Sequence, residues 1–138
     1  MPNRAVSSFE VTGWDQTPYG GEGDGPSFSR ATVRKSFSGD LAGESTAELL
    51  MCQADPSSLD AGAGYVASEL VVGRLGDREG SFVLQHWGLT GGGLPNRTAG
   101  HVVPGTGTDG LTGLSGVIEI SVDADGAHSI SIDYEIKG

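Results

Sequence analysis

One pairing of side chains in this sequence could carry out acid–base chemistry. Glu69 and His86 lie in two neighbouring segments of alternating polarity that are joined by the turn-forming residues 76–79. A four-residue turn there would place the glutamate directly opposite the histidine, with Tyr65 on the same face. A carboxylate and an imidazole in contact can move a proton on or off a bound small molecule. We therefore predict Glu69 and His86 as the catalytic pair.

The face on which this pair lies decides its role, and the alternation leaves both faces open. The opposite face of the same two segments is the more apolar one, since it carries Val66, Leu70 and Val72. Periodicity therefore favours an external ion pair of Glu69 and His86. If the pair instead faces the interior, it forms a polar pocket within an apolar cavity. There burial raises the pKa of the carboxyl and the pairing opposes that shift.

Several further side chains are candidates for contact with a small molecule. They are aromatic rings, an imidazole and an amide, all on strands predicted below. Aromatic rings supply apolar surface, while hydroxyl, amide and imidazole groups supply hydrogen bonds. The candidates for substrate binding are Tyr65, Phe82, Gln85, Trp87, His128 and Tyr134.

Other apparent motifs do not support a cofactor or a metal ion. Residues 105–110 match the glycine spacing of a dinucleotide fingerprint, but no phosphate-binding helix follows them. We expect that loop to plug one end of the fold through Leu111 and Leu114. Residues 123–126 indicate a turn rather than a calcium loop, because no bidentate glutamate follows at the required offset. The three histidines lack the spacing of a zinc site, so we predict no metal and no cofactor.

Composition argues against several classes of partner. The chain has 138 residues, 24 of them glycine, with 18 acidic and 8 basic side chains and a formal charge of −10. Phosphates would repel such a surface, which argues against nucleic acid. We find no apolar stretch of the length that a signal peptide or a membrane span requires. The single cysteine, Cys52, fits a reducing compartment. We expect one domain over residues 1–138, cytoplasmic and without membrane contact.

Alternating segments separated by glycine, proline, aspartate and serine recur along the whole chain. Mostly short connections favour an up-and-down meander, and closure removes exposed sheet edges. We therefore predict an all-β fold, an eight-stranded antiparallel closed barrel that is wide enough to hold a small ligand. The predicted strands are 6–14, 28–37, 41–53, 64–75, 80–89, 96–103, 116–123 and 127–136.

Matching of faces predicts the register of the last hairpin. A three-residue turn at 124–126 sets Ile120 beside Ile130 and Val122 beside His128, so that one face is apolar with a histidine at its end.

The same test on an earlier hairpin predicts a turn at 38–40. Arg34 then lies opposite Glu44, and Arg30 lies opposite Glu48. We interpret these two glutamates as solvated partners of the arginines. The alternative is a pocket that holds two carboxylates.

Four stretches of the chain resemble a bacterial domain-of-unknown-function family that is similar to the allene oxide cyclase-like barrels. They are residues 9–14, 37–48, 80–86 and 102–114. The resemblance implies an eight-stranded antiparallel barrel with a hydrophobic cavity. In the plant cyclases, steric confinement, a glutamate and a bound water direct an unstable epoxide to one stereoisomer. Their motifs are not evident here, so no catalytic residue is carried over. Related small barrels direct coupling or cyclisation in natural-product pathways, which belong to secondary metabolism.

Two functional hypotheses follow. The first is a cofactor-independent isomerase or cyclase that folds a small apolar molecule in the cavity. Glu69 and His86 would be its acid–base partners, and Tyr65 and Tyr134 its hydrogen-bond donors. The alternative is a non-catalytic barrel, a carrier or sensor that binds small hydrophobic ligands and is compatible with a homodimer. A buried carboxylate beside an open cavity favours the enzyme, and a dry aliphatic cavity favours the carrier.

Overall fold

The computed structural model describes residues 3–20 and 25–137, which form eight strands and two short 3-10 helices. All eight predicted strands are present, and the first is longer than predicted at both ends. In the described residues, no helix is long and apolar enough to cross a membrane. The strands are β1 Asn3–Gly20, β2 Ser27–Gly39, β3 Leu41–Gln53, β4 Ala63–Leu75, β5 Arg78–Thr90, β6 Arg97–Val102, β7 Leu114–Val122 and β8 His128–Ile136, and the 3-10 helices are η1 Leu59–Ala61 and η2 Asp109–Leu111.

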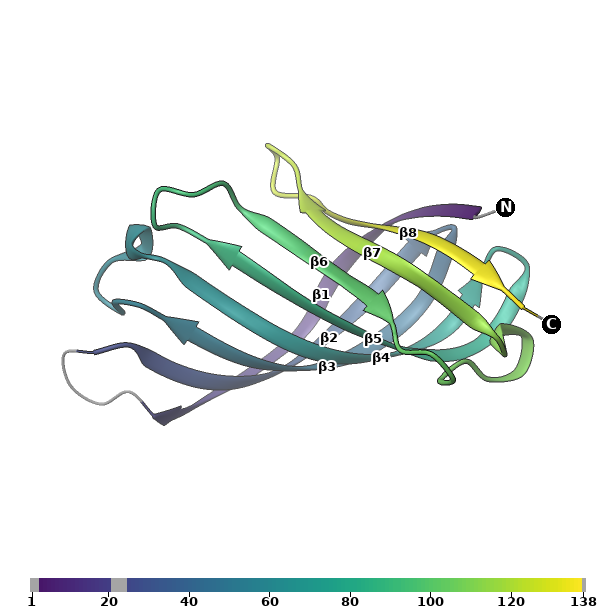
Figure 1. Cartoon of the computed structure of the whole chain (residues 1–138), viewed down its shortest axis with the longest axis horizontal. Helices are drawn as coiled ribbons and strands as arrows, with labels where there is room; N and C mark the ends of the chain where they lie inside the picture. The colour runs from purple at the N-terminus through teal and green to yellow at the C-terminus, as the bar shows by residue number, and fades with distance from the viewer. Residues whose placement is uncertain (1–2, 21–24, 138) are drawn as a thin grey trace.

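The strands form one antiparallel sheet that closes into a ring (Figure 1). Each strand pairs with its neighbours in sequence, and residues 3–9 of β1 pair with β8 to complete the circle. The ring is irregular, because the ladder between β6 and β7 covers only Gly100 with Ile118 and His101 with Val117 in the described chain. The predicted all-β class and the closed antiparallel ring are confirmed.

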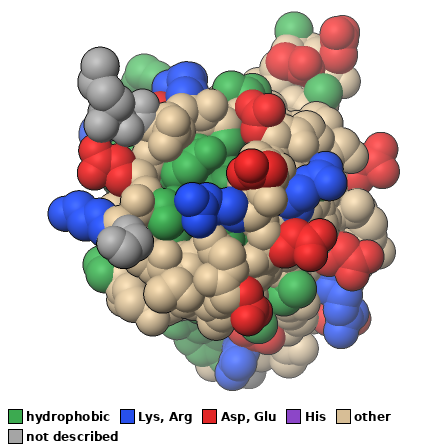
Figure 2. Space-filling model, turned by 90° about the vertical axis from the view of Figure 1, so that its right-hand side faces the viewer, with side chains coloured by type: hydrophobic (Ala, Val, Ile, Leu, Met, Phe, Trp, Pro, Cys, Tyr) green, Lys and Arg blue, Asp and Glu red, His purple; other side chains and the backbone are tan. Residues whose placement is uncertain are grey.

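One end of the ring is closed by the loop that follows β6. Leu111 and Leu114 are fully buried there, as predicted for a plug. The hydroxyls of Thr106 and Thr108 accept hydrogen bonds from the backbone N–H groups of Val83 and Ser81, respectively, each at 3.0 Å. The loop therefore continues the hydrogen bonding of β5 beyond the end of β6. Figure 2 looks onto this end and shows apolar side chains at its centre, between acidic and basic ones.

The interior of the ring divides into two apolar clusters of different character. The larger cluster fills the closed end with big side chains that include Phe82 and Leu111. The smaller cluster lies toward the open end and consists mainly of small side chains on β2, β3 and β4. Small inward residues leave space in the lumen that large ones would fill. The smaller cluster comprises Ala31, Val33, Ala47, Leu49 and Ala67.

The predicted register of the last hairpin is confirmed. Ile120 pairs with Ile130 and Val122 pairs with His128 across β7 and β8. The face was predictable because both strands alternate apolar and polar residues without interruption, so a shift of one residue would mix the faces.

Two other predicted registers are wrong by two residues. In the β2–β3 hairpin Val33 pairs with Ala47, and in the β4–β5 hairpin His86 pairs with Ala67 rather than with Glu69. The faces are unchanged, because a shift of two residues preserves the alternation. The β4–β5 turn is therefore two residues long rather than four, and the centre of the β2–β3 turn moves from Gly39 to Asp40.

Contacts between the hairpins explain why the turns differ from those predicted. The Asp40 carboxylate accepts the backbone N–H of Val6 on β1 at 2.9 Å, and the Asp40 carbonyl accepts the N–H of Gly76 at 2.8 Å. Gly76 has a φ of 64°, a conformation that glycine adopts without strain, which allows the β4–β5 turn to close in two residues. Neighbouring strands thus select turns that neither hairpin specifies alone.

The shift in the β2–β3 hairpin also moves the predicted charge pairs. Arg34 lies opposite Thr46 rather than Glu44. Arg30 reaches Glu48 only diagonally, with Nε 3.6 Å from the carboxylate, and both side chains are exposed. Glu44 and Glu48 lie on the outer surface, so the alternative of two carboxylates in a pocket is wrong.

The plug predicts a sharp difference between two leucines. Leu111→Ala should lower the free energy of unfolding by about 2–5 kcal/mol, because it leaves a cavity in a fully buried site. Leu94→Ala, at a side chain that is 71% exposed, should change it by less than about 0.5 kcal/mol. Urea denaturation of both variants measures the difference, and equal effects would contradict the plug.

Candidate functional site

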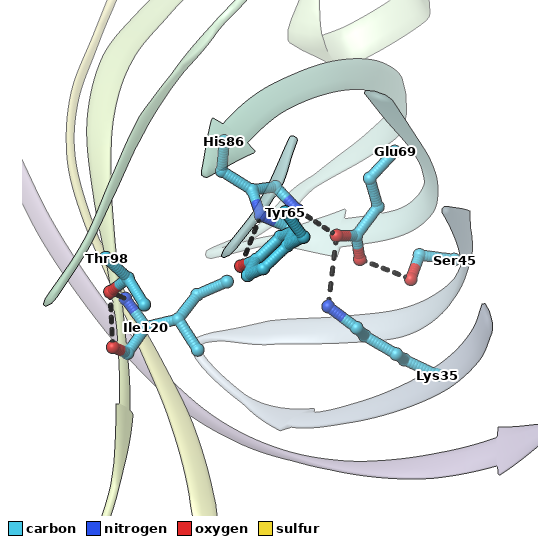
Figure 3. A network of polar contacts seen from close by, with 7 residues as sticks. All are labelled: Lys35, Ser45, Tyr65, Glu69, His86, Thr98 and Ile120. Atoms are coloured by element: carbon cyan, nitrogen blue, oxygen red, sulfur yellow. Dashed lines mark hydrogen bonds and ion pairs between the residues drawn. The ribbon is translucent and has the colours of Figure 1, made fainter. Parts of the chain in front are cut away.

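Five side chains from four strands meet inside the ring and form one hydrogen-bonded group, which we call the buried network (Figure 3). Glu69 on β4 lies at its centre and is 1% exposed. Its carboxylate accepts a hydrogen bond from the Ser45 hydroxyl at 2.6 Å and from the Lys35 Nζ at 3.1 Å. His86 Nε2 lies 2.7 Å from the same carboxylate, and His86 Nδ1 lies 2.9 Å from the Tyr65 hydroxyl.

The register of the strands brings these groups together diagonally. Glu69 lies opposite Leu84, and His86 lies opposite Ala67, so the carboxylate and the imidazole meet across one step of the ladder. Gly88 lies opposite Tyr65, and a Cβ at that position would overlap the tyrosine ring. The glycine therefore allows the ring to lie against β5, edge-on to the imidazole of His86.

The structure places the pair inside the ring, so the preference for an external ion pair is wrong. The apolar residues that favoured it, Val66, Leu70 and Val72, are about half exposed on the outer surface. Periodicity misled here because the inward positions of this stretch of β4 hold small Ala67 and the hydrogen-bonded Tyr65 and Glu69. The larger aliphatic residues of the same stretch lie on the outer surface.

Lys35 and the two hydrogen-bond donors keep Glu69 ionised. Burial alone would raise the pKa of this carboxyl, but the hydrogen bond from His86, the charge of Lys35 and the hydrogen bond from Ser45 together lower it to about 2. Lys35 Nζ also lies 4.7 Å from the centroid of the Phe9 ring. Among the described residues, no buried side-chain nitrogen or oxygen lacks a hydrogen-bond partner.

The Tyr65 hydroxyl keeps its proton over the whole physiological range. Burial, and then the nearby negative charge of Glu69, raise its pKa to about 12. Tyr65 is therefore a neutral hydroxyl group that is coupled through His86 to a buried carboxylate.

A cavity of about 850 Å³ lies at the open end of the ring, opposite the plug. Tyr65 lines it, whereas the other four members of the buried network lie behind the tyrosine. At its side wall the Thr98 hydroxyl donates to the carbonyl of Ile120 at 2.6 Å and accepts its N–H at 3.1 Å. This side chain replaces a rung of the ladder where β6 and β7 separate (Figure 3).

The sequence matches the family described as "Protein of unknown function (DUF3224)" over residues 5–134. The chain belongs to the DUF3224 family. A crystal structure of a protein with unknown function from this family, from Shewanella oneidensis MR-1, is 33% identical with a TM-score of 0.80, and the match covers 100% of each chain. No curated protein matches the chain. The predicted resemblance to a bacterial domain-of-unknown-function family is thus confirmed.

Of the residues predicted to bind substrate, this DUF3224 chain brings only Tyr65 to the cavity. Phe82 and Tyr134 face inward but pack in the core of the closed end. His128 also faces inward and stacks on Phe9, with ring centroids 5.1 Å apart. Gln85 and Trp87 lie on the outer face, where the amide of Gln85 donates to Ser68 and the guanidinium of Arg97 lies over the ring of Trp87.

Two members of the buried network, Lys35 and Ser45, were missed by the sequence analysis. Their signal was nevertheless present. Lys35 is in phase with Val33 and Phe37, so the alternation places a charged side chain on the inward face of β2. A lysine on an apolar face requires a buried carboxylate as a partner, and Glu69 was the carboxylate on an inward candidate face.

The described chain contains no group of three or more histidine, cysteine, aspartate or glutamate side chains with a geometry suited to a metal ion. The three histidines lie apart, since only His86 belongs to the buried network.

The depressed pKa of Glu69 predicts a dependence of stability on pH. The folded-state pKa lies near 2 and the ordinary value is 4.5, so the ionised carboxylate contributes stability above about pH 4.5. That contribution, on the order of 3 kcal/mol, should be lost as the pH falls from about 5 to 2. Glu69→Gln should flatten the slope of unfolding free energy over this range, while Glu48→Gln on the outer surface should retain it. Equal slopes in both variants would contradict the assignment.

The ion pair predicts a non-additive double substitution. Lys35→Met leaves the buried carboxylate without its cation and should cost about 3–5 kcal/mol of stability. Adding Glu69→Gln to Lys35→Met should recover a large part of that loss, because no unpaired charge remains. Denaturation of both single variants and the double variant measures the coupling. A double variant whose loss equals the sum of the single losses would show that the pair does not interact.

Proposed function

We propose that this protein is a cofactor-independent isomerase or cyclase that holds a small, largely apolar molecule in its cavity and moves a proton through Tyr65. The observation that supports the proposal best is a continuous chain of contacts from the cavity into the interior. The Tyr65 hydroxyl contacts His86 Nδ1 at 2.9 Å, and His86 Nε2 contacts the Glu69 carboxylate at 2.7 Å. The group that meets the substrate is then Tyr65, with His86 and Glu69 acting behind it.

This chain of contacts provides a route for a proton from the substrate to Tyr65 and from Tyr65 to His86. A C–H bond next to a carbonyl group of the substrate breaks, its electron pair remains on the substrate as an enolate, and its proton passes to the Tyr65 oxygen. The tyrosine passes its own proton to His86 Nδ1, and the Glu69 carboxylate stabilises the resulting imidazolium. Reversal of these steps at another atom returns the proton and completes an isomerisation without any cofactor.

Shape would supply the rest of the catalysis. A cavity closed at one end confines a flexible molecule, and confinement selects one folded conformation for ring closure. The resemblance to the allene oxide cyclase-like barrels, in which confinement directs the product, agrees with this proposal and with a role in secondary metabolism. The single cysteine, Cys52, supports a reducing, cytoplasmic setting.

A non-catalytic carrier or sensor is the second candidate. The observation that favours it is the complete pairing of the buried network within the described residues, since such a network also stabilises a fold without reacting. Exchange of carbon-bound hydrogen in a bound molecule distinguishes the two candidates, because only the enzyme would catalyse it.

The proposed proton transfer predicts catalysed exchange of carbon-bound hydrogen. Neutral bicyclic ketones such as 1-tetralone should incorporate deuterium next to the carbonyl group faster with the protein in D2O than without it, as read by mass spectrometry. Tyr65→Phe should lower the catalysed rate by at least about 100-fold, because the acid–base group is lost. Tyr134→Phe, at a tyrosine in the closed-end core, should retain the rate. If none of these ketones shows catalysed exchange, the result favours the carrier.

A further inference from the structure

The ionised carboxylate of Glu69 fixes which nitrogen of His86 carries a proton. A carboxylate only accepts hydrogen bonds, so His86 Nε2, at 2.7 Å from it, must be an N–H donor. The pKa of Glu69 near 2 keeps this arrangement throughout the neutral range. In the uncharged imidazole, Nδ1 then has a free lone pair and can only accept.

The tautomer of His86 in turn orients the proton of Tyr65. The Tyr65 hydroxyl lies 2.9 Å from Nδ1, so it donates its single proton to that nitrogen. Once the proton is used in this way, the tyrosine oxygen offers only lone pairs to the cavity that it lines. The cavity therefore meets Tyr65 as a hydrogen-bond acceptor, which reverses the donor role predicted from the sequence.

The side chains of the cavity wall that point into the lumen are uncharged in the described parts of the chain, residues 3–20 and 25–137. They include the polar groups of Gln16, Ser29 and Thr98 beside apolar Met51 and Ile120.

Two charged residues, Arg97 and Glu119, also border the cavity, but their side chains point to the outer face. The guanidinium of Arg97 lies over Trp87 on the outer face, and Glu119 alternates with the inward-facing residues of β7. Behind the wall, Lys35 and Glu69 neutralise each other at 3.1 Å. A charged ligand would therefore lose its hydration inside the cavity without gaining a counter-charge.

We propose that the cavity selects neutral molecules that carry a hydroxyl group, namely alcohols, enols or phenols, whose O–H donates to the Tyr65 oxygen. This inference rests on the proposed function in using the same cavity, and it adds the chemical class of the ligand. It fits the proton transfer above, because both use the Tyr65 oxygen as an acceptor: of the ligand's O–H hydrogen bond on binding, and of the C–H proton in the reaction.

Three matched probes test the proposal: 1-naphthol, its methyl ether 1-methoxynaphthalene, and 1-naphthoate. In the wild-type protein at pH 7, the naphthol should bind about three- to tenfold more tightly than the ether, the increment that one hydrogen bond contributes. The naphthoate should bind no more tightly than the ether. Calorimetric or fluorescence titration measures all three dissociation constants.

Two tyrosine variants isolate the hydrogen bond from the difference in probe size. Tyr65→Phe should reduce the preference for naphthol over ether to less than about twofold, whereas Tyr134→Phe should leave it unchanged. Comparing the ratio of the two constants between proteins cancels the steric effect of the methyl group. The same ratio in wild type and Tyr65→Phe, or tightest binding of the naphthoate, would overturn the inference.

The tautomer has its own readout. The nitrogen-15 spectrum of the wild-type protein at pH 7 should show His86 with a protonated Nε2 and an unprotonated Nδ1. A spectrum with both nitrogens protonated would overturn the inference, because Tyr65 would then donate to the cavity.

Failure of the inference and failure of the proposed function give different results. An unchanged naphthol preference in Tyr65→Phe, combined with loss of deuterium exchange in that variant, removes the ligand class and retains the isomerase. The expected naphthol preference without exchange of any ketone retains the ligand class and removes the isomerase.

Discussion

The buried charge of Glu69 is the constraint on which the middle of the ring depends. An ionised carboxylate that is 1% exposed requires a partner on every side, and three strands each supply one: Lys35 from β2, Ser45 from β3 and His86 from β5. The registers of β2 to β5 are thereby tied to a single group. The same charge sets the tautomer of His86 and, through it, the direction in which Tyr65 donates.

The two ends of the ring divide stability and function between them. Large side chains and the plug with Leu111 fill the closed end, so most of the apolar burial lies there. Toward the open end the interior holds small residues such as Ala31 and Ala47, and Gly88 lines the cavity, which leaves room for Tyr65 and for the cavity. A well-packed end allows the other end to remain hollow. The buried network lies between these two regions, where apolar packing gives way to the cavity.

Much of the fold was predictable from the sequence, and the candidate site was predictable in part. Period-two alternation identified all eight strands, and its regularity in the last hairpin fixed the pairing of Ile120 with Ile130. Glu69 and His86 were recognised as partners although their predicted register was wrong, because a diagonal contact tolerates a shift of two residues. Lys35 was overlooked because each hairpin was considered alone, and its carboxylate partner lies two strands away.

By itself, the sequence determined which residues share a face, since that follows from the alternation along each strand and needs no partner. Only the tertiary structure decided which of the two faces points inward, where each turn lies, and which side chains reach the cavity. Those outcomes depend on closure of the ring, which limits the volume inside, and on contacts such as those of Asp40 with Val6 and Gly76 that join strands distant in sequence. The alternation along each strand gives no information on the curvature of the closed sheet or on these contacts.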